Sequence, residues 1–253
     1  MSGRVEHLAE GVTLHLGDCR DVLPTLGKVD AVVTDPPYLV SKGGYAANLQ
    51  LDGGFGGWMK DYGNQGDIVT CDLCFDDWMP VVFDALRDSA QAYFMTNGRN
   101  IKSMQTAGEA AGFRLHTILV WDKRAALPNK YYQNVTEFAL FMFKGKAFTI
   151  ADPSSKNLIS LFQRDDSPHP TEKPVGLMEL WIRNSSQFGE TILDPFMGSG
   201  TTGVAAARLG RKFVGVEVDP KFFDMARQRI SAALNAPILF SERPSPSKQE
   251  ALL

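Results

Sequence analysis

The tetrapeptide Asp35-Pro36-Pro37-Tyr38 combines a carboxylate, a rigid turn and an aromatic ring. It follows the run Val29-Asp30-Ala31-Val32-Val33, which has the β-branched composition of a short buried strand. The two prolines cannot continue a hydrogen-bonded strand ladder, so the strand is expected to end there. Open α/β sheets bind their ligands outside the carboxyl ends of the strands. We therefore expect Asp35 to lie at a ligand-binding edge, as part of a rigid polar site beside an aromatic ring.

A second stretch with chemical potential is the glycine-rich segment that runs from Asp194 to Gly203, with the pattern G-x-G-x-x-G beginning at Gly198. Glycine lacks a Cβ atom and lets a ligand approach the backbone closely, and a helix N-terminus offers free N–H groups to a carboxylate. Glu217 stands at the end of the next expected strand, where an acid can accept hydrogen bonds from both ribose hydroxyls. The segment therefore predicts a nucleoside-binding loop.

Taken alone, this loop is equally compatible with a nicotinamide-dependent dehydrogenase. Two features favour S-adenosylmethionine instead. The Asp194 carboxylate directly before the loop would repel a pyrophosphate, whereas it suits the ammonium group of an amino-acid-bearing nucleoside. A dinucleotide unit usually opens its sheet, whereas this loop follows most of the expected strands. A tight strand-to-helix turn without a ligand is the structural alternative, and the tetrapeptide at Asp35 argues against it.

The elements that must position these residues alternate between strands and helices. Hydrophobic periodicity predicts strands over residues 12–16, 29–33, 90–96, 115–121, 137–143, 191–194 and 212–217. It predicts helices over residues 76–89, 175–184, 201–209 and 220–234, another from about residue 100 through 112, and a short helical segment around Asp21. This alternation indicates βαβ units and a mainly parallel sheet, with strands 115–121 and 137–143 open to an antiparallel arrangement.

Composition restricts the class of protein. The chain has 253 residues with 44% apolar and 22% charged content, which predicts one substantial core and a single domain. The net charge of −3 means that a polyanion would have to be held by local basic patches. There is no long apolar run and no signal-peptide pattern at the N-terminus, so we expect no membrane association and a cytoplasmic location. Cys71 and Cys74 have the spacing of half a zinc site, but no second pair completes it, and structural thiols are expected instead of a metal.

Three motifs together carry a family resemblance. Asp35-Pro36-Pro37-Tyr38, His169-Pro170-Thr171-Glu172-Lys173-Pro174 and the segment Asp194 to Thr202, in that order, resemble the β class of amino-group DNA methyltransferases, over about residues 17–230. The resemblance implies an α/β class I S-adenosylmethionine-dependent methyltransferase fold, Rossmann-like and circularly permuted, whose sheet is mostly parallel with an antiparallel strand. We accordingly predict one catalytic domain over residues 1–236, insertions at about 39–74 and 144–167 as candidate DNA-recognition segments, and a flexible tail over 237–253.

The resemblance also implies a role for each matching residue. The Asp35 carboxylate and the Pro36 carbonyl would hold the exocyclic amine of a flipped-out base, with Pro37 in the turn and Tyr38 stacked on the base. The amine would attack the methyl group directly, with no metal and no covalent enzyme intermediate. In the S-adenosylmethionine site, Asp18 would accept the adenine amino group, Glu217 would bind the ribose and Lys173 would pair with the carboxylate of the methionine moiety. The loop residues of that site are Asp194, Pro195, Phe196, Gly198, Ser199, Gly200, Thr201 and Thr202.

DNA is the expected partner, and its phosphates would be bound by basic residues in loops. The candidates are Lys42, Lys60, Arg99, Lys123, Arg124 and Lys130. With Asp35 as its first residue, the tetrapeptide resembles that of the adenine-N6 members of the family more than that of the cytosine-N4 members, which implies adenine N6 as the acceptor. An RNA base or a protein glutamine is a further alternative, although such relatives generally carry the cofactor loop before the tetrapeptide. A homodimer and a companion restriction endonuclease are left open as partners.

Overall fold

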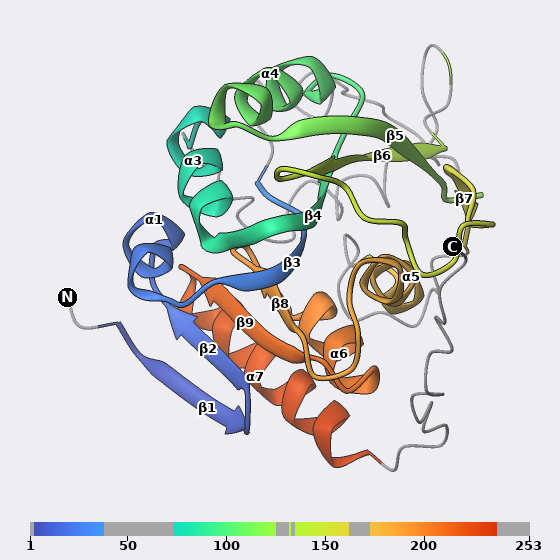
Figure 1. Cartoon of the computed structure of the whole chain (residues 1–253). Helices are drawn as coiled ribbons and strands as arrows, with labels where there is room; N and C mark the ends of the chain where they lie inside the picture. Colours follow the sequence, from blue (N-terminus) through green and yellow to red (C-terminus); the bar gives the residue numbers. More distant parts are fainter. Residues whose placement is uncertain (1–2, 38–72, 125–131, 133–134, 162–172, 237–253) are drawn as a thin grey trace, which may run out of the picture.

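One mixed sheet organises the structure, a computed structural model that describes residues 3–37, 73–124, 132, 135–161 and 173–236 (Figure 1). Within these residues the sheet has nine strands in the order β1-β2-β9-β8-β3-β4-β6-β5-β7. The strands are β1 (Val5–Ala9), β2 (Val12–Leu16), β3 (Val29–Thr34), β4 (Leu86–Thr96), β5 (Arg114–Asp122), β6 (Thr136–Phe143), β7 (Leu158–Ser160), β8 (Thr191–Asp194) and β9 (Lys212–Glu217).

The strand directions confirm the predicted mostly parallel sheet with an antiparallel strand. β2, β9, β8, β3 and β4 are parallel neighbours, and β6 runs against both β4 and β5. β8 and β9 come last in the chain, yet they occupy the positions between β2 and β3. In the sequence, the β3–β4 region thus comes before the strand that precedes the glycine loop, although that strand lies next to β3 in the sheet. This order agrees with the predicted permutation.

Helices cover both faces of this sheet. α1 (Cys19–Val22), the 3-10 helix η1 (Leu23–Thr25), α3 (Phe75–Ala85) and α4 (Ile101–Ala111) pack on one face, and α5 (Val175–Ser185), α6 (Thr201–Arg208) and α7 (Pro220–Asn235) pack on the other (Figure 1). Each face has its own apolar core. Trp78 and Met104 are buried in the first core, and Trp181 and Phe223 in the second. Burying two such faces is what holds the strand ends, and the residues just beyond them, in fixed positions.

The boundary between α3 and β4 differs from the prediction. A helix over residues 76–89 is wrong at its end, because α3 ends at Ala85 and Leu86 already pairs with Val29 of β3. Leu86 is fully buried and its spacing fits the apolar stripe of the helix equally well, so periodicity alone could not locate the boundary. Ser89 has a φ of 61°, and the register between β3 and β4 shifts around it.

Two strands were not predicted at all. β1 forms an antiparallel edge pair with β2, and its side chains alternate between exposed and half-buried, so it lacks a run of apolar residues. β7 has three residues and lies within the segment 144–167, which was expected to be an insertion. Both are edge strands of the sheet. Edge strands bury little surface and therefore leave a weak pattern in the sequence.

Candidate active site

Four carboxylates follow neighbouring strands at one edge of the sheet. Asp18 comes shortly after β2, Glu217 ends β9, Asp194 ends β8, and Asp35 directly follows β3. These four strands are parallel and adjacent in the order β2-β9-β8-β3, so the acids occur along the carboxyl edge in that same order. The predicted position of Asp35 at the sheet edge is confirmed, and the structure places Asp194 at the end of the neighbouring strand.

Asp194 is the most deeply buried of these acids, with 3% of its surface exposed. Its Oδ1 atom accepts hydrogen bonds from the Thr34 hydroxyl at 2.6 Å and from the Phe196 backbone N–H at 3.1 Å. Burial raises the pKa of Asp194 to about 7; hydrogen bonds from Thr34, Thr202 and Phe196 oppose this shift, while the charge of Asp35 adds to it. The Thr34 bond also ties the end of β3 to the end of β8, and so fixes the spacing of the two candidate functional segments.

The glycine loop turns β8 into α6 through two left-handed residues, Gly198 at φ 49° and Gly200 at φ 87°. A Cβ atom on Gly200 would lie 2.9 Å from Cα and Cβ of Ala226 in α7, so this position combines a positive φ with close helix packing. Gly198 by contrast has open space where its Cβ atom would be. From α7, Arg229 donates hydrogen bonds to the Ser199 carbonyl and hydroxyl at 2.7 and 2.8 Å. These bonds hold the loop against α7.

Glu217 joins the loop to the end of β9. Its Oε2 atom accepts a hydrogen bond from the Gly198 N–H at 2.9 Å, and its Oε1 atom accepts one from the Asp219 N–H at 2.8 Å. Burial raises the pKa of Glu217 above its usual value, and these backbone N–H groups act in the opposite direction. A half-buried acid at a strand end, a loop with open space at Gly198 and the N-terminus of α6 together fit a nucleoside that carries an amino acid.

Asp18 lies at the predicted edge, but it is already engaged. Its carboxylate caps α1 by accepting from the Arg20 N–H at 2.8 Å, and the Arg20 guanidinium binds it at 2.6 Å. The side-chain hydrogen bonds from Arg20 lower the pKa of Asp18, against a smaller effect of burial. An adenine amino group would therefore have to share this carboxylate with Arg20, and the predicted role of Asp18 stays a prediction.

Lys173 was predicted to pair with the cofactor carboxylate, but in the structure it contacts two carboxylates of the protein itself. Its Nζ atom lies 3.0 Å from Asp35 Oδ2 and 3.0 Å from Glu137 Oε2. Burial alone would lower the pKa of Lys173, but the two carboxylates more than offset it and raise the pKa above its ordinary value. Sequence reasoning missed Glu137. The available signal was a carboxylate at the start of the otherwise apolar strand β6.

Comparison with known proteins assigns the chain to a family. A family model described as DNA methylase matches residues 29–228. The chain belongs to this DNA methylase family. The methylase is 28% identical over 230 residues to the type II methyltransferase M2.DpnII of Streptococcus pneumoniae, with 81% of this chain and 83% of the relative covered. The predicted family and the predicted S-adenosylmethionine-dependent DNA methyltransferase activity are confirmed.

Solved structures show the same fold. The crystal structure of the M1.HpyAVI–SAM complex matches the methylase with a TM-score of 0.66 and 25% identity, covering 87% of this chain and 98% of that one. The cytosine-N4-specific PvuII DNA methyltransferase matches with a TM-score of 0.64, covering 88% and 91% of the two chains, but at 18% identity it supports the fold alone. The predicted class I methyltransferase fold and the S-adenosylmethionine cofactor are thereby confirmed.

The predicted DNA-binding residues are only partly in the described residues. Lys42, Lys60, Lys130 and also Tyr38 lie outside them. Arg99 is exposed just beyond the end of β4, which neighbours β3, and Arg124 is exposed after β5. Lys123 was predicted as a DNA contact in a loop, but it is mostly buried and its Nζ atom pairs with Glu137 Oε1 at 3.2 Å.

The remaining polar features of the described residues offer no second site of this kind. In residues 3–37, 73–124, 132, 135–161 and 173–236, no three His, Cys, Asp or Glu side chains are grouped as metal ligands. Cys74 is exposed, and burial raises the pKa of the Cys19 thiol to about 12. None of the helices in this part of the chain combines the length and apolar character that would be needed to span a bilayer.

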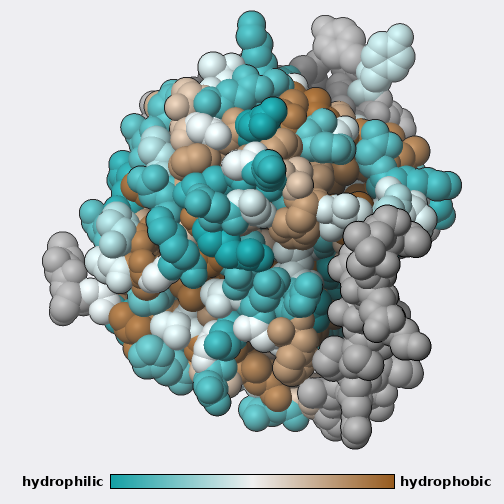
Figure 2. All heavy atoms as spheres, viewed as in Figure 1, coloured by the Kyte–Doolittle hydropathy of each residue, from teal (hydrophilic) through white to brown (hydrophobic). Residues whose placement is uncertain are grey.

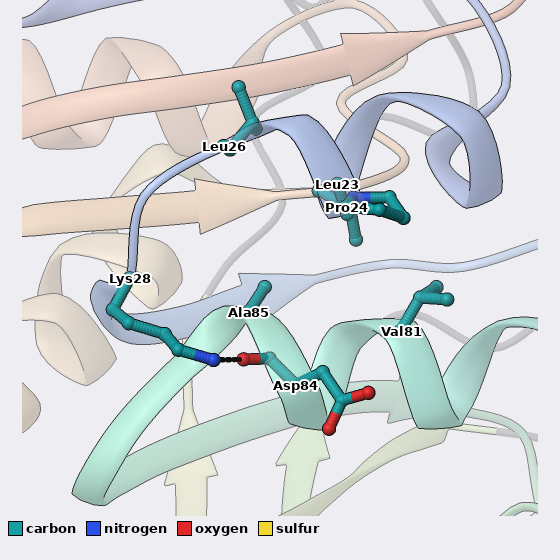
Figure 3. Close-up of a pocket in the computed structure, with 7 residues that line it drawn as sticks. All are labelled: Leu23, Pro24, Leu26, Lys28, Val81, Asp84 and Ala85. Carbon is teal, nitrogen blue, oxygen red and sulfur yellow. Dashed lines mark hydrogen bonds between the residues drawn. The ribbon is translucent and has the colours of Figure 1, made fainter.

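Two hollows in the described residues lie away from the carboxyl edge. One, of about 340 Å³, lies between η1 and α3 and includes Lys28, which immediately precedes β3 and donates a hydrogen bond to the Asp84 carbonyl (Figure 3). The other, of about 480 Å³, includes Arg211, which immediately precedes β9. Elsewhere, the face shown in Figure 2 intersperses hydrophilic and hydrophobic residues. Neither hollow is lined by any of the four acids at the carboxyl edge.

Proposed function

We propose that this methylase transfers the methyl group of S-adenosylmethionine to the exocyclic N6 amine of adenine in DNA. The observation that carries the proposal is the position of Asp35, beyond β3 and next to the strand that ends in the buried acid Asp194. One acid is thereby available for an acceptor amine and the other for the cofactor. An aspartate as the first residue of the tetrapeptide supports adenine over cytosine.

Asp35 and Pro36 act on the acceptor amine in this proposal. An exocyclic base amine is a poor nucleophile because its lone pair is delocalised into the ring. Two acceptors, the Asp35 carboxylate and the Pro36 carbonyl, hold the two amine hydrogens and so localise the lone pair on nitrogen. As the nitrogen forms the new N–C bond, the S–CH3 bond of the donor would break and its electron pair would stay on sulfur, leaving neutral S-adenosylhomocysteine. The nitrogen then loses one proton, for which we assign Asp35 as the acceptor. A fixed carboxylate also stabilises the positive charge that develops on nitrogen.

The loop and its neighbours bind and orient the donor. When bound, S-adenosylmethionine supplies an electrophilic methyl group on a sulfonium centre. Asp194 in its ionised form pairs with the ammonium group of the methionine moiety, and the free N–H groups at the start of α6 are available to its carboxylate. Glu217 accepts from the ribose hydroxyls. Arg229 fixes Ser199 and with it the course of the loop.

The biological setting is part of the proposal. The relatives named as type II methyltransferases support membership in a restriction–modification system, with a companion endonuclease that cuts the same site. We also propose that Arg99 and Arg124, which are exposed beyond the ends of β4 and β5, bind DNA phosphates. The single catalytic domain over residues 1–236, a homodimer and a cytoplasmic location stay predictions.

Product analysis tests the proposed base. The enzyme is incubated with DNA and S-adenosylmethionine that carries tritium in its methyl group, and the DNA is digested to nucleosides and separated beside standards. We expect the label in N6-methyldeoxyadenosine. Label in N4-methyldeoxycytidine would overturn the choice of adenine, and label that enters RNA or protein but not DNA would overturn the choice of DNA. Methylation-sensitive sequencing of the same DNA then gives the recognition sequence.

A further inference from the structure

Four charged side chains form a continuous chain that ends at Asp35. Lys123 pairs with Glu137 at 3.2 Å, Glu137 pairs with Lys173 at 3.0 Å, and Lys173 pairs with Asp35 at 3.0 Å. The four residues come from separate segments: the end of β5, the start of β6, the residue two before α5 and the end of β3. The two ammonium groups and two carboxylates balance in charge.

Lys173 is well buried within this group of four charged residues. Its side chain is 12% exposed, against 23% for Glu137 and 31% for Asp35. A buried ammonium group is costly without a partner, and Glu137 supplies one that it shares with Lys123. The contact with Asp35 completes the charge balance of the four residues. It sets a cation directly on Oδ2 of the carboxylate that the proposed mechanism uses.

We propose that Lys173 is a positioning residue for Asp35, and that Glu137 holds Lys173 in place for this task. The inference rests on the proposed function, because that function gives Asp35 the amine to hold. A carboxylate has two oxygens and about four acceptor positions, so it can keep Lys173 and still accept from an amine. The ammonium group limits the rotation of the carboxylate and so prepares a fixed acceptor.

Two other roles for Lys173 make different predictions. If Lys173 pairs with the cofactor carboxylate, its loss weakens cofactor binding. If Lys173 only balances the charge of Glu137, its loss slows methyl transfer only while Glu137 keeps its negative charge, and the rate returns when Glu137 is also made neutral. The variants Lys173→Met and Lys173→Met/Glu137→Gln separate these roles, because the double variant removes one charge of each sign and keeps the chain balanced. Lys144→Met is the matched control, since Lys144 is a half-buried lysine just beyond the other end of β6.

The experiment measures the single-turnover rate of label transfer to DNA at saturating S-adenosylmethionine, together with the affinity for S-adenosylhomocysteine by calorimetry. We expect Lys173→Met and the double variant to transfer the methyl group about 100-fold more slowly than the wild type, as misplacement of a reacting group produces. Their S-adenosylhomocysteine affinities are expected to stay within about threefold of the wild type, well below the tenfold loss that one missing charge-assisted hydrogen bond produces. Lys173→Arg keeps the charge and is expected to recover a large part of the rate.

Two results would overturn the inference: wild-type rates in the double variant, or a loss confined to S-adenosylhomocysteine affinity. Because total label in DNA is counted, a product in cytosine would refute the choice of adenine while the ratio between wild type and variant still tests Lys173. Wild-type enzyme that labels no DNA would refute the proposed function itself. The two failures are therefore distinguishable.

Discussion

At the scale of a single residue, the proposed pairing of Asp194 with the cofactor predicts that cofactor binding depends on pH. Its pKa near 7 in the ligand-free protein means that a fraction of the molecules carry a neutral acid at neutral pH. Only the ionised form can pair with an ammonium group. We therefore expect the affinity for S-adenosylhomocysteine, measured by calorimetry, to rise between pH 6 and pH 8, with a loss approaching about tenfold per pH unit on the acidic side.

The control for this prediction is Asp194→Asn, which removes the titrating group and keeps the shape of the side chain. We expect this variant to bind S-adenosylhomocysteine weakly and with little change between pH 6 and pH 8. Equal wild-type affinities at pH 6 and pH 8 would contradict the assignment of Asp194 to the ammonium group.

The same burial predicts how stability changes with pH. The ordinary pKa of an aspartate is 3.8, and the folded protein raises that of Asp194 to about 7. Between these two values the folded state binds more protons at Asp194 than the unfolded state, so this residue lowers the free energy of unfolding as pH rises from about 4 to about 7. Urea unfolding of the ligand-free protein across this range measures the effect. The difference in unfolding free energy between wild type and Asp194→Asn should follow this course, and a difference that is independent of pH would contradict it.

At this scale the sequence identified the types of residue better than their partners. Asp35, Asp194 and Glu217 could be predicted as edge acids because each ends a recognisable strand. The contact between Lys173 and Glu137 could not be predicted, because residues 36 positions apart meet only through the register of β6 against the rest of the sheet. The pairing of Asp18 with Arg20 is local and partly exposed, and the residue types alone did not show that Arg20 binds this carboxylate.

At the scale of the element, a positive φ and close packing against α7 coincide at Gly200 of the glycine loop. An alanine there would adopt an unfavourable positive φ and would press its Cβ atom against Ala226. We expect Gly200→Ala to lower the free energy of unfolding by about 2–4 kcal/mol and to weaken S-adenosylhomocysteine binding, because α6 and α7 must move apart. Denaturant unfolding and calorimetry measure the two effects.

Gly176 in the first turn of α5 is the matched control for Gly200→Ala. Its Cβ position has no atom within 4 Å, and its φ is not positive. Gly176→Ala should therefore be neutral or raise the free energy of unfolding by up to about 1 kcal/mol. A Gly200→Ala variant as stable as Gly176→Ala would contradict the described packing of α7 against the loop.

The existence of most elements could be predicted from periodicity, and their ends less well. The helices α5 and α7 and the strands β8 and β9 follow clear patterns between turn residues and were predicted within a residue or two. The end of α3 was not, because Leu86 fits both a helix stripe and a buried strand. Pairing with β3 decides between them, and such tertiary contacts are invisible in a local window.

At the scale of the whole molecule, the acceptor and cofactor regions share one sheet. β8 and β9 lie between β2 and β3, so removing either region would expose the apolar faces of the other. We expect thermal unfolding of the chain to show one cooperative transition, by circular dichroism and by tryptophan fluorescence alike. S-adenosylhomocysteine at about 100 times its dissociation constant should stabilise the protein by about 2.7 kcal/mol and shift this transition as a whole. Two separate transitions, with only one shifted by the ligand, would contradict the single-domain prediction.

The order of the strands was the part of the topology that local patterns could not supply. Periodicity indicated a mainly parallel sheet and the resemblance implied a circular permutation, but neither specified that β8 and β9 lie between β2 and β3. Strand order depends on contacts between residues far apart in the chain, such as Val12 with Phe213.

The most direct test of the account is the fate of methyl transfer when Asp35 is changed. Asp35→Ala removes the acceptor, and Asp35→Asn keeps its shape while removing its charge. We predict that both variants transfer tritium from S-adenosylmethionine to DNA at least about 100-fold more slowly than the wild type. Their affinity for S-adenosylhomocysteine should stay within about threefold, because Asp194 and the glycine loop are intact. Methyl transfer near the wild-type rate in Asp35→Ala would contradict the assignment of Asp35 as the residue that holds the target amine.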